Sequence, residues 1–256
     1  EIVPAIRAPK KRQQIWREQN VWPRGVDREV VEALHRTHIG DDQDPTHILN
    51  HAIRTALADG WGGSMIATDI SDILFGTPAP ILGQANLGVI KEDMVNVVVH
   101  GHEQTMREML VNASKGPEAI EYAKAAGANG IQLSGICCTA NEILMRQGIP
   151  AAGNFLHQEL AIMTGAVEAM VVDVQCIMQA LVGLAQNFHT AIITTSPKVK
   201  IKGATHIEFD EHKALTIAKQ ILKVAIDNFK NRDNNKTRIP QIKEDLIPGF
   251  SHEYIN

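Results

Sequence analysis

Short runs of β-branched residues alternate with amphipathic segments over the last two-thirds of the chain. The runs at 95–99, 130–133, 169–174 and 191–195 are almost continuously apolar, which is typical of parallel strands buried on both faces. Segments with helical spacing accompany them at 104–114, 118–126, 139–146, 158–164, 177–185 and 212–229. This alternation predicts right-handed βαβ crossovers, and therefore an α/β fold built on a Rossmann-like, doubly wound parallel sheet.

The first part of the chain has a different pattern, because apolar residues recur there only at helical spacing. Helices are predicted at 9–20, 26–38 and 46–57, and the third ends at Asp59 in the glycine-rich turn 59–63. We therefore expect a helical segment with its glycine-rich turn at 1–83 and the α/β domain at 84–230. Residues 231–256 are expected to form a linker toward an absent domain. Because the chain begins at Glu1 rather than Met, we also expect a piece of a larger protein.

Composition narrows the class of protein. The 256 residues are 44% hydrophobic and 21% charged, as in ordinary globular domains, and no apolar run is long enough to span a membrane. A net charge of −4 argues against a nucleic-acid partner. The three cysteines are too few for a disulfide framework, which favours a reducing compartment and hence the cytoplasm.

Candidate metal ligands follow three of the predicted strands. His100 and His102 come after 95–99, Cys137 and Cys138 after 130–133, and Cys176 after 169–174. Ligands of an open α/β sheet bind beyond the carboxyl ends of its strands, so these side chains are expected on one functional edge. Imidazole and thiolate are ligands for nickel, iron and zinc.

The sequence around the cysteines favours ionised sulfur. Thr139 and Glu142 form a T-x-x-E pattern, which predicts a capping box and a helix that begins just after Cys138. Cys176 is likewise expected to open a helix. The positive end of a helix dipole lowers the pKa of a thiol and favours the thiolate that binds metal.

Two other interpretations fit the same residues. His102, Cys138 and Cys176 could bind a single zinc or iron ion, with Glu103 as the only nearby general base. Alternatively the thiols are core residues of a non-catalytic α/β interaction module, since buried cysteine is common. No G-x-G-x-x-G follows a strand, so a dinucleotide site is not expected.

Five stretches resemble the nickel–iron–sulfur, anaerobic carbon monoxide dehydrogenases over nearly the whole chain. They are ADGWGGSM (58–65), DILFGTP (72–78), VVVHGHE (97–103), GICCTANE (135–142) and VDVQCIM (172–178). The GICC and DVQC stretches are the most specific. The form that associates with acetyl-CoA synthase is the most similar.

The resemblance implies a homodimeric enzyme that converts CO and water to CO2, protons and electrons, with a ferredoxin-type electron carrier as partner. It implies that His102, rather than His100, binds the outer iron of a Ni-Fe-S cluster, the C-cluster, together with Cys138. Cys176 would bind another iron, and Cys137 would touch or line the cluster. Asp59 would be a carboxylate that positions an acid/base group of another domain.

The chain departs from the family pattern in its cysteine count. The family needs three further C-cluster cysteines, a catalytic lysine and cysteines for [4Fe-4S] relay clusters, whereas Cys137, Cys138 and Cys176 are the only cysteines here. We therefore expect the end of the helical domain and the middle α/β domain of such an enzyme, inactive by themselves.

Overall fold

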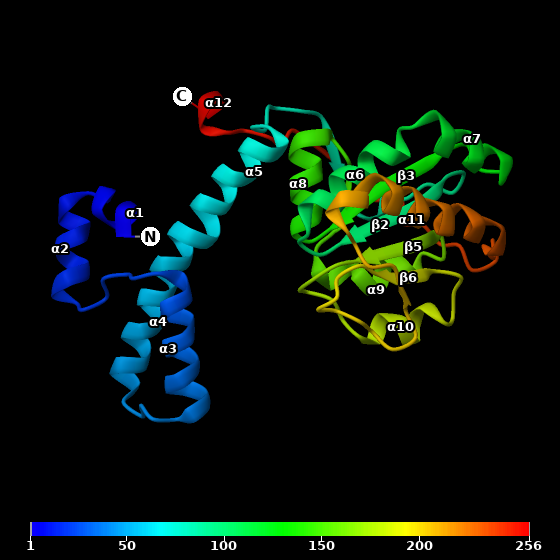
Figure 1. The fold of residues 1–256 in the computed structure, drawn as a ribbon. Helices are drawn as coiled ribbons and strands as arrows, with labels where there is room; N and C mark the ends of the chain where they lie inside the picture. Colours follow the sequence, from blue (N-terminus) through cyan, green and yellow to red (C-terminus); the bar gives the residue numbers. More distant parts are fainter. Residues whose placement is uncertain (1, 256) are drawn as a thin grey trace. The chain divides into compact units, whose positions relative to one another are not determined.

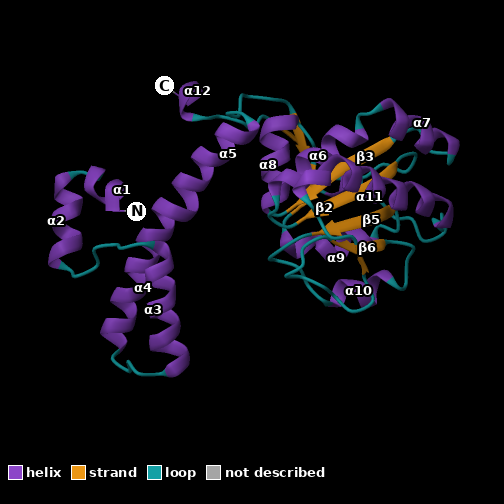
Figure 2. Cartoon of the chain, viewed as in Figure 1, coloured by secondary structure: helices purple, strands orange, loops and turns teal. Residues whose placement is uncertain are grey.

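A computed structural model describes residues 2–255 and divides the chain into two compact units, Glu1–Thr77 and Pro78–Asn256. The first unit is helical and the second contains the sheet (Figures 1 and 2). The boundary falls at 77/78, six residues before the predicted 83/84. The reason is that the first strand of the sheet, β1, already begins at Gly83 and the chain that leads into it belongs to the second unit.

The helical unit contains the three predicted helices and others that were not predicted. Its elements are α1 (Ile2–Arg7), α2 (Lys10–Glu18), α3 (Val26–Leu34), the π-helical turn η1 (His35–Ile39), α4 (Pro45–Asp59), a second π-helical stretch η2 (Gly60–Ile66) and α5 (Ala67–Phe75). The predicted glycine-rich turn is thus helical, and it continues α4 into α5. Glycine lowers helix propensity by only about 1 kcal/mol per residue, which tertiary contacts readily offset.

A buried carboxylate holds the helical unit together. Glu29 on α3 has no exposed surface, and its two oxygens lie 2.8 Å from Arg24 Nε and 2.7 Å from Arg54 Nε. Burial alone raises the pKa of Glu29, but the hydrogen bonds from the two guanidinium groups outweigh it and lower the pKa to about 2. The ion pairs of Glu29 therefore connect α3 to α4 through Arg54, and to the chain before α3 through Arg24.

The second unit is built on one eight-stranded sheet in the order β7-β6-β5-β2-β3-β4-β1-β8. The strands are β1 (Gly83–Ala85), β2 (Val95–His100), β3 (Ile131–Ile136), β4 (Ala151–Gly153), β5 (Val167–Val172), β6 (Ala191–Thr194), β7 (Thr205–His206) and β8 (Glu244–Leu246). All neighbouring pairs are parallel except β1 and β8. The predicted α/β fold with a doubly wound parallel sheet is confirmed.

Helices cover both faces of this sheet. They are α6 (Gln104–Ser114), α7 (Pro117–Ala125), α8 (Cys138–Gln147), α9 (Gln158–Met163), α10 (Ala180–Ala185) and α11 (Ala214–Asn228). Alternate residues of β2 point to opposite cores: Val97 packs in the cluster that includes α6 and α11, and Val98 in the cluster that includes α9 and α10. Each central strand is buried on both sides, as its continuous apolar run indicates.

Residues 231–256, expected to be a linker, carry part of the sheet instead. Within this segment β8 pairs with β1, and a short helix, α12 (His252–Ile255), follows. Arg232 lies at its start and ion-pairs with the fully buried Glu168 on β5. The polar composition of the segment hid this strand, because β8 is an edge strand and its side chains are mostly exposed. No helix among residues 2–255 has the length and apolar character needed to cross a bilayer.

Candidate metal centre

The register of three central strands brings the candidate ligands to one edge of the sheet. His100, the last residue of β2, stands beside Ile136 of β3 on one side and Val172 of β5 on the other. All three strands are parallel and end at the same level. The loops that follow them therefore begin next to one another, although 72 positions of sequence separate the ends of β2 and β5.

His102 is held in one orientation by the loop after β5. Its ring Nδ1 lies 3.0 Å from the carbonyl oxygen of Val174, so Nδ1 carries the proton and donates it to that carbonyl. Its backbone N–H donates a hydrogen bond of 2.5 Å to Oδ1 of Asp173. The remaining ring nitrogen, Nε2, is the one with a lone pair, as metal-binding histidines require.

His100 has a structural role in this arrangement. Its side chain is completely buried, and Nε2 lies 3.1 Å from Gln158 Oε1 and 3.0 Å from the carbonyl oxygen of Cys176. Burial lowers the pKa of His100, which keeps the ring neutral. The contact with Cys176 ties the end of β2 to the cysteine loop.

Cys138 begins helix α8, close to where the sequence predicted a helix start, but the predicted capping box is wrong. The Thr139 hydroxyl donates to the carbonyl oxygen of Gly101 at 2.6 Å, and the Thr139 backbone N–H donates to the same oxygen at 3.1 Å. Glu142 instead pairs with Arg146. Thr139 therefore connects the Cys138 loop to the His102 loop, and the connection replaces the local cap.

Cys176 does not open a helix, contrary to expectation. Helix α10 begins only at Ala180, and Cys176 lies in the preceding loop, where it and Gln175 have left-handed φ values of 55° and 62°. Cys137 has a φ of 66°. These are three of the five non-glycine residues with positive φ among residues 2–255. Such strained backbone often occurs at functional sites, and no sequence pattern revealed it.

The three thiols are free and lie close enough to influence one another. Cys138 and Cys176 are exposed, whereas Cys137 is half-buried. Burial, followed by the neighbouring charges of Cys176 and Cys138, raises the pKa of Cys137 to about 12. Its environment thus favours the neutral thiol form of Cys137.

The geometry does not suit a single metal ion. Within the described part of the chain, no three His, Cys, Asp or Glu side chains are grouped closely enough to hold one ion. Glu103, the only candidate base for such a site, caps α6 instead: its two oxygens accept the backbone N–H groups of Thr105 and Met106 at 3.0 and 2.7 Å. The ligands of a metal cluster need not meet at one atom, because they bind different metal atoms.

Asp59 belongs to the helical unit, where it ends α4. Its carboxylate lies over Gly63, so closely that a Cβ at position 63 would be 2.1 Å from Oδ1. The glycine at position 63 is thus explained locally by the space that Asp59 occupies. The predicted role of Asp59 toward another domain stays a prediction.

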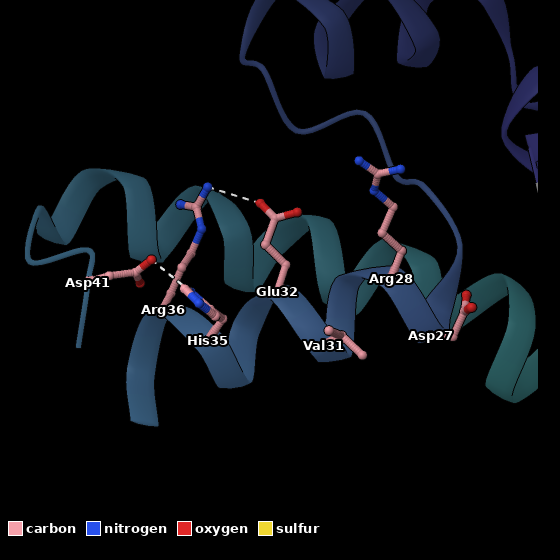
Figure 3. A pocket seen from close by; sticks show the side chains of 7 residues that line it. All are labelled: Asp27, Arg28, Val31, Glu32, His35, Arg36 and Asp41. Carbon is pink, nitrogen blue, oxygen red and sulfur yellow. Dashed lines mark hydrogen bonds and ion pairs between the residues drawn. The ribbon is translucent and has the colours of Figure 1, made fainter. Parts of the chain in front are cut away.

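The helical unit also contains a cavity of about 580 Å³ along α3. Figure 3 shows two pairs among its polar side chains: His35 lies 2.7 Å from Asp41, and Arg36 lies 3.0 Å from Glu32. Glu32 also contacts Arg54. These four lining side chains are therefore paired within the unit.

Asp173 is the residue of this site that sequence reasoning passed over. It lies directly after β5, is 1% exposed, and accepts hydrogen bonds from the backbone N–H groups of three residues: His102, Glu103 and Val174. Its position directly after the apolar residues 169–172 and three residues before Cys176 was the available signal.

Known proteins that are similar to this chain are named as carbon monoxide dehydrogenases. Carbon monoxide dehydrogenase 1 of Methanosarcina acetivorans is 56% identical over 254 residues, which are 99% of this chain and 40% of that protein. The carbon monoxide dehydrogenase/acetyl-CoA synthase subunit beta of Moorella thermoacetica is 49% identical over 244 residues, 94% of this chain and 36% of that protein. The chain thus spans about two-fifths of the length of the curated relatives it matches.

Solved structures share the fold as well. A Ni-free crystal structure of carbon monoxide dehydrogenase from Thermococcus sp. AM4 superimposes with a TM-score of 0.93 at 56% identity, covering 97% of this chain and 39% of that one. The family model that describes the Prismane/CO dehydrogenase family matches residues 4–252. The chain therefore belongs to the Prismane/CO dehydrogenase family.

Proposed function

We propose that this chain supplies a histidine and two cysteines to the nickel–iron–sulfur C-cluster of a carbon monoxide dehydrogenase. The observation that supports this most strongly is the tautomer of His102, whose Nδ1–H donates to Val174 while Nε2 is left for a metal. The loops with Cys138 and Cys176 start at the same edge of the sheet. Relatives that cover nearly the whole chain carry the name of this enzyme.

In this proposal His102 and Cys138 bind the outer iron and Cys176 binds a second iron. The exposed sulfurs of Cys138 and Cys176 are available for ligation. Cys137, whose pKa is raised by burial, stays protonated and lines the cluster. The other cluster cysteines, and those of the [4Fe-4S] relay clusters, would lie outside this sequence, which contains only three.

When bound, the cluster supplies the two-electron chemistry of CO + H2O ⇌ CO2 + 2H⁺ + 2e⁻. The protein's own part begins with position, because the Val174 carbonyl fixes the His102 ring and Thr139 fixes the neighbouring loop. Asp59 would orient an acid/base group that accepts the protons. The strained backbone at Cys137 and Cys176 holds the sulfurs where relaxed loops would not.

The proposal extends to partners and location. The electrons would pass to a ferredoxin-type carrier, and the protein would act as a homodimer in the cytoplasm. Three free cysteines agree with a reducing compartment. An acetyl-CoA synthase subunit is a further partner, since a relative of 49% identity is named as a subunit of such a complex.

Serine substitutions test the proposal. In the protein at its full natural length, produced without oxygen, Cys138→Ser and Cys176→Ser are expected to lose nickel and CO-dependent reduction of an acceptor dye together. Cys137→Ser should retain nickel. If both Cys138→Ser and Cys176→Ser keep full activity, the thiols are structural and the interaction-module interpretation replaces this one.

A further inference from the structure

The carboxylate of Asp173 is held by backbone N–H groups of the loops that carry His102 and Cys176. Its Oδ1 accepts the N–H of His102 at 2.5 Å and that of Val174, and Oδ2 accepts the N–H of Glu103 at 3.0 Å. The carboxylate is 1% exposed. Three backbone donors on one buried carboxylate fix the directions of the peptide groups on both sides of the His102 Cα.

The neighbouring residue shows how tightly this contact is made. Gly101 has a φ of +133°, and a Cβ built there would lie 1.9 Å from Asp173 Oδ1. Any larger residue at 101 would displace the carboxylate from the His102 N–H. The glycine between the two histidines is therefore matched to Asp173, in the loop after β2.

A buried cation offsets part of the charge on Asp173. Arg107 on α6 is 2% exposed, its Nε donates to the Glu103 carbonyl, and its Nη1 has no hydrogen-bond partner in the described part of the chain. Burial lowers the pKa of Arg107, and the charges of Asp173 and Glu103 act in the opposite direction. Asp173 is thus buried, and backbone N–H groups and the charge of Arg107 stabilise its carboxylate in place of water.

We infer that Asp173 is a positioning residue for the metal centre: through the backbone of His102 it sets where the imidazole Nε2 points. This inference rests on the proposed function, in which His102 is an iron ligand. Asp173 is not itself placed as a ligand, because both of its oxygens are occupied by backbone donors.

Asn at position 173 is the most conservative test. The amide keeps the size of the side chain, but it retains only one oxygen, so at least one of the three N–H contacts is lost. In the holoenzyme at full natural length, Asp173→Asn is expected to change the electron paramagnetic resonance spectrum of the cluster. CO oxidation per folded enzyme should fall by about 10- to 100-fold, as when other partners that orient metal ligands are removed.

Glu168→Gln provides a matched control. Glu168 is a fully buried carboxylate on β5, the strand that leads to Asp173, and it also accepts a backbone N–H from β2, that of Asn96 at 2.6 Å, at the other end of the strand pair. This variant removes a buried charge between β2 and β5 but does not contact the His102 loop. Its cluster spectrum should match that of the unmodified enzyme even where the protein unfolds more easily.

Gly101→Ala is the second route to the same effect, because it displaces the carboxylate without removing its charge. A changed spectrum in Asp173→Asn or Gly101→Ala, with an unchanged spectrum in Glu168→Gln, supports the inference. It is overturned if the folded Asp173→Asn enzyme has the unmodified spectrum, or if Glu168→Gln changes the spectrum to the same degree. It is also overturned if both loop variants fail to fold while Glu168→Gln folds, since Asp173 would then act through stability.

A His102→Ala arm separates this inference from the proposed function. If His102→Ala leaves the spectrum unchanged, His102 is not a ligand and the proposed ligand set fails. If His102→Ala changes the spectrum and Asp173→Asn does not, the proposed function stands and only the role of Asp173 is wrong.

Discussion

The imidazole of His102 and the carbonyl of Val174 form a hydrogen bond of 3.0 Å that joins the loops after two neighbouring strands. Because a backbone carbonyl can only accept, this contact assigns the proton to Nδ1. The loop that carries Cys176, two residues beyond Val174, thus orients the imidazole of His102 in the other loop.

The reactivity of the thiols follows from their environment. In the chain without metal, Cys138 and Cys176 are expected to be alkylated by iodoacetamide at pH 8, while Cys137 reacts only as the pH approaches its raised pKa of about 12. The reason is that the thiolate is the reactive form, and a raised pKa delays its appearance. Mass spectrometry of the labelled peptides across pH measures the order. Equal labelling of Cys137 and Cys138 at pH 8 would contradict this account.

The fit between Gly101 and Asp173 predicts a large cost for a methyl group. Gly101→Ala should lower the free energy of unfolding by about 2 kcal/mol or more, because it combines a positive φ with a steric clash. Gly183→Ala on α10 is the control: a Cβ there meets nothing within 4 Å, and alanine favours a helix by about 1 kcal/mol. Urea unfolding followed by circular dichroism compares the two. If Gly101→Ala and Gly183→Ala change the free energy of unfolding by the same amount, the clash at position 101 is relieved by a shift of the loop.

The helical unit should lose stability in acid through Glu29. Its pKa is lowered from the ordinary 4.5 to about 2, so its contribution is complete above pH 4.5 and is lost as the pH falls through 2. At neutral pH Glu29→Gln should cost about 3 kcal/mol, because Arg24 and Arg54 would lose their charged partner.

The stability of the helical unit can be measured by tryptophan fluorescence, because all three tryptophans, Trp16, Trp22 and Trp61, lie in that unit. Their fluorescence during urea unfolding therefore reports on that unit. Asp27→Asn, which removes an exposed carboxylate from the first turn of the same helix, should cost at most about 1 kcal/mol. An equal loss of unfolding free energy in Glu29→Gln and Asp27→Asn would show that the buried ion pairs contribute no more to stability than a charge at the helix terminus.

The sequence predicted the sheet well because its central strands are buried on both faces and carry an unmistakable apolar run. It did not predict the short strands β4 and β8: each is only three residues long, and β8, at the edge of the sheet, is largely exposed. Helix α5 was missed because the glycines before it suggested a break, whereas the backbone there is continuous π-helix and α-helix.

The candidate site was predicted in its location but not in its contacts. Placing His102, Cys138 and Cys176 after neighbouring strands needed only the parallel topology. The Asp173 turn, the Thr139–Gly101 contact and the strained cysteines depend on pairs of residues far apart in sequence, which no local pattern encodes. For the same reason the T-x-x-E pattern was misleading, since a long-range partner competed for Thr139.

The position of the metals tests the central claim most directly. Crystals of the full-length protein, grown without oxygen, allow anomalous diffraction to be measured at the iron and nickel absorption edges. The proposed function predicts iron within about 2.0–2.3 Å of His102 Nε2 and of the sulfurs of Cys138 and Cys176, with nickel in the same centre. Iron and nickel bound elsewhere, with these three side chains free of metal, would contradict it.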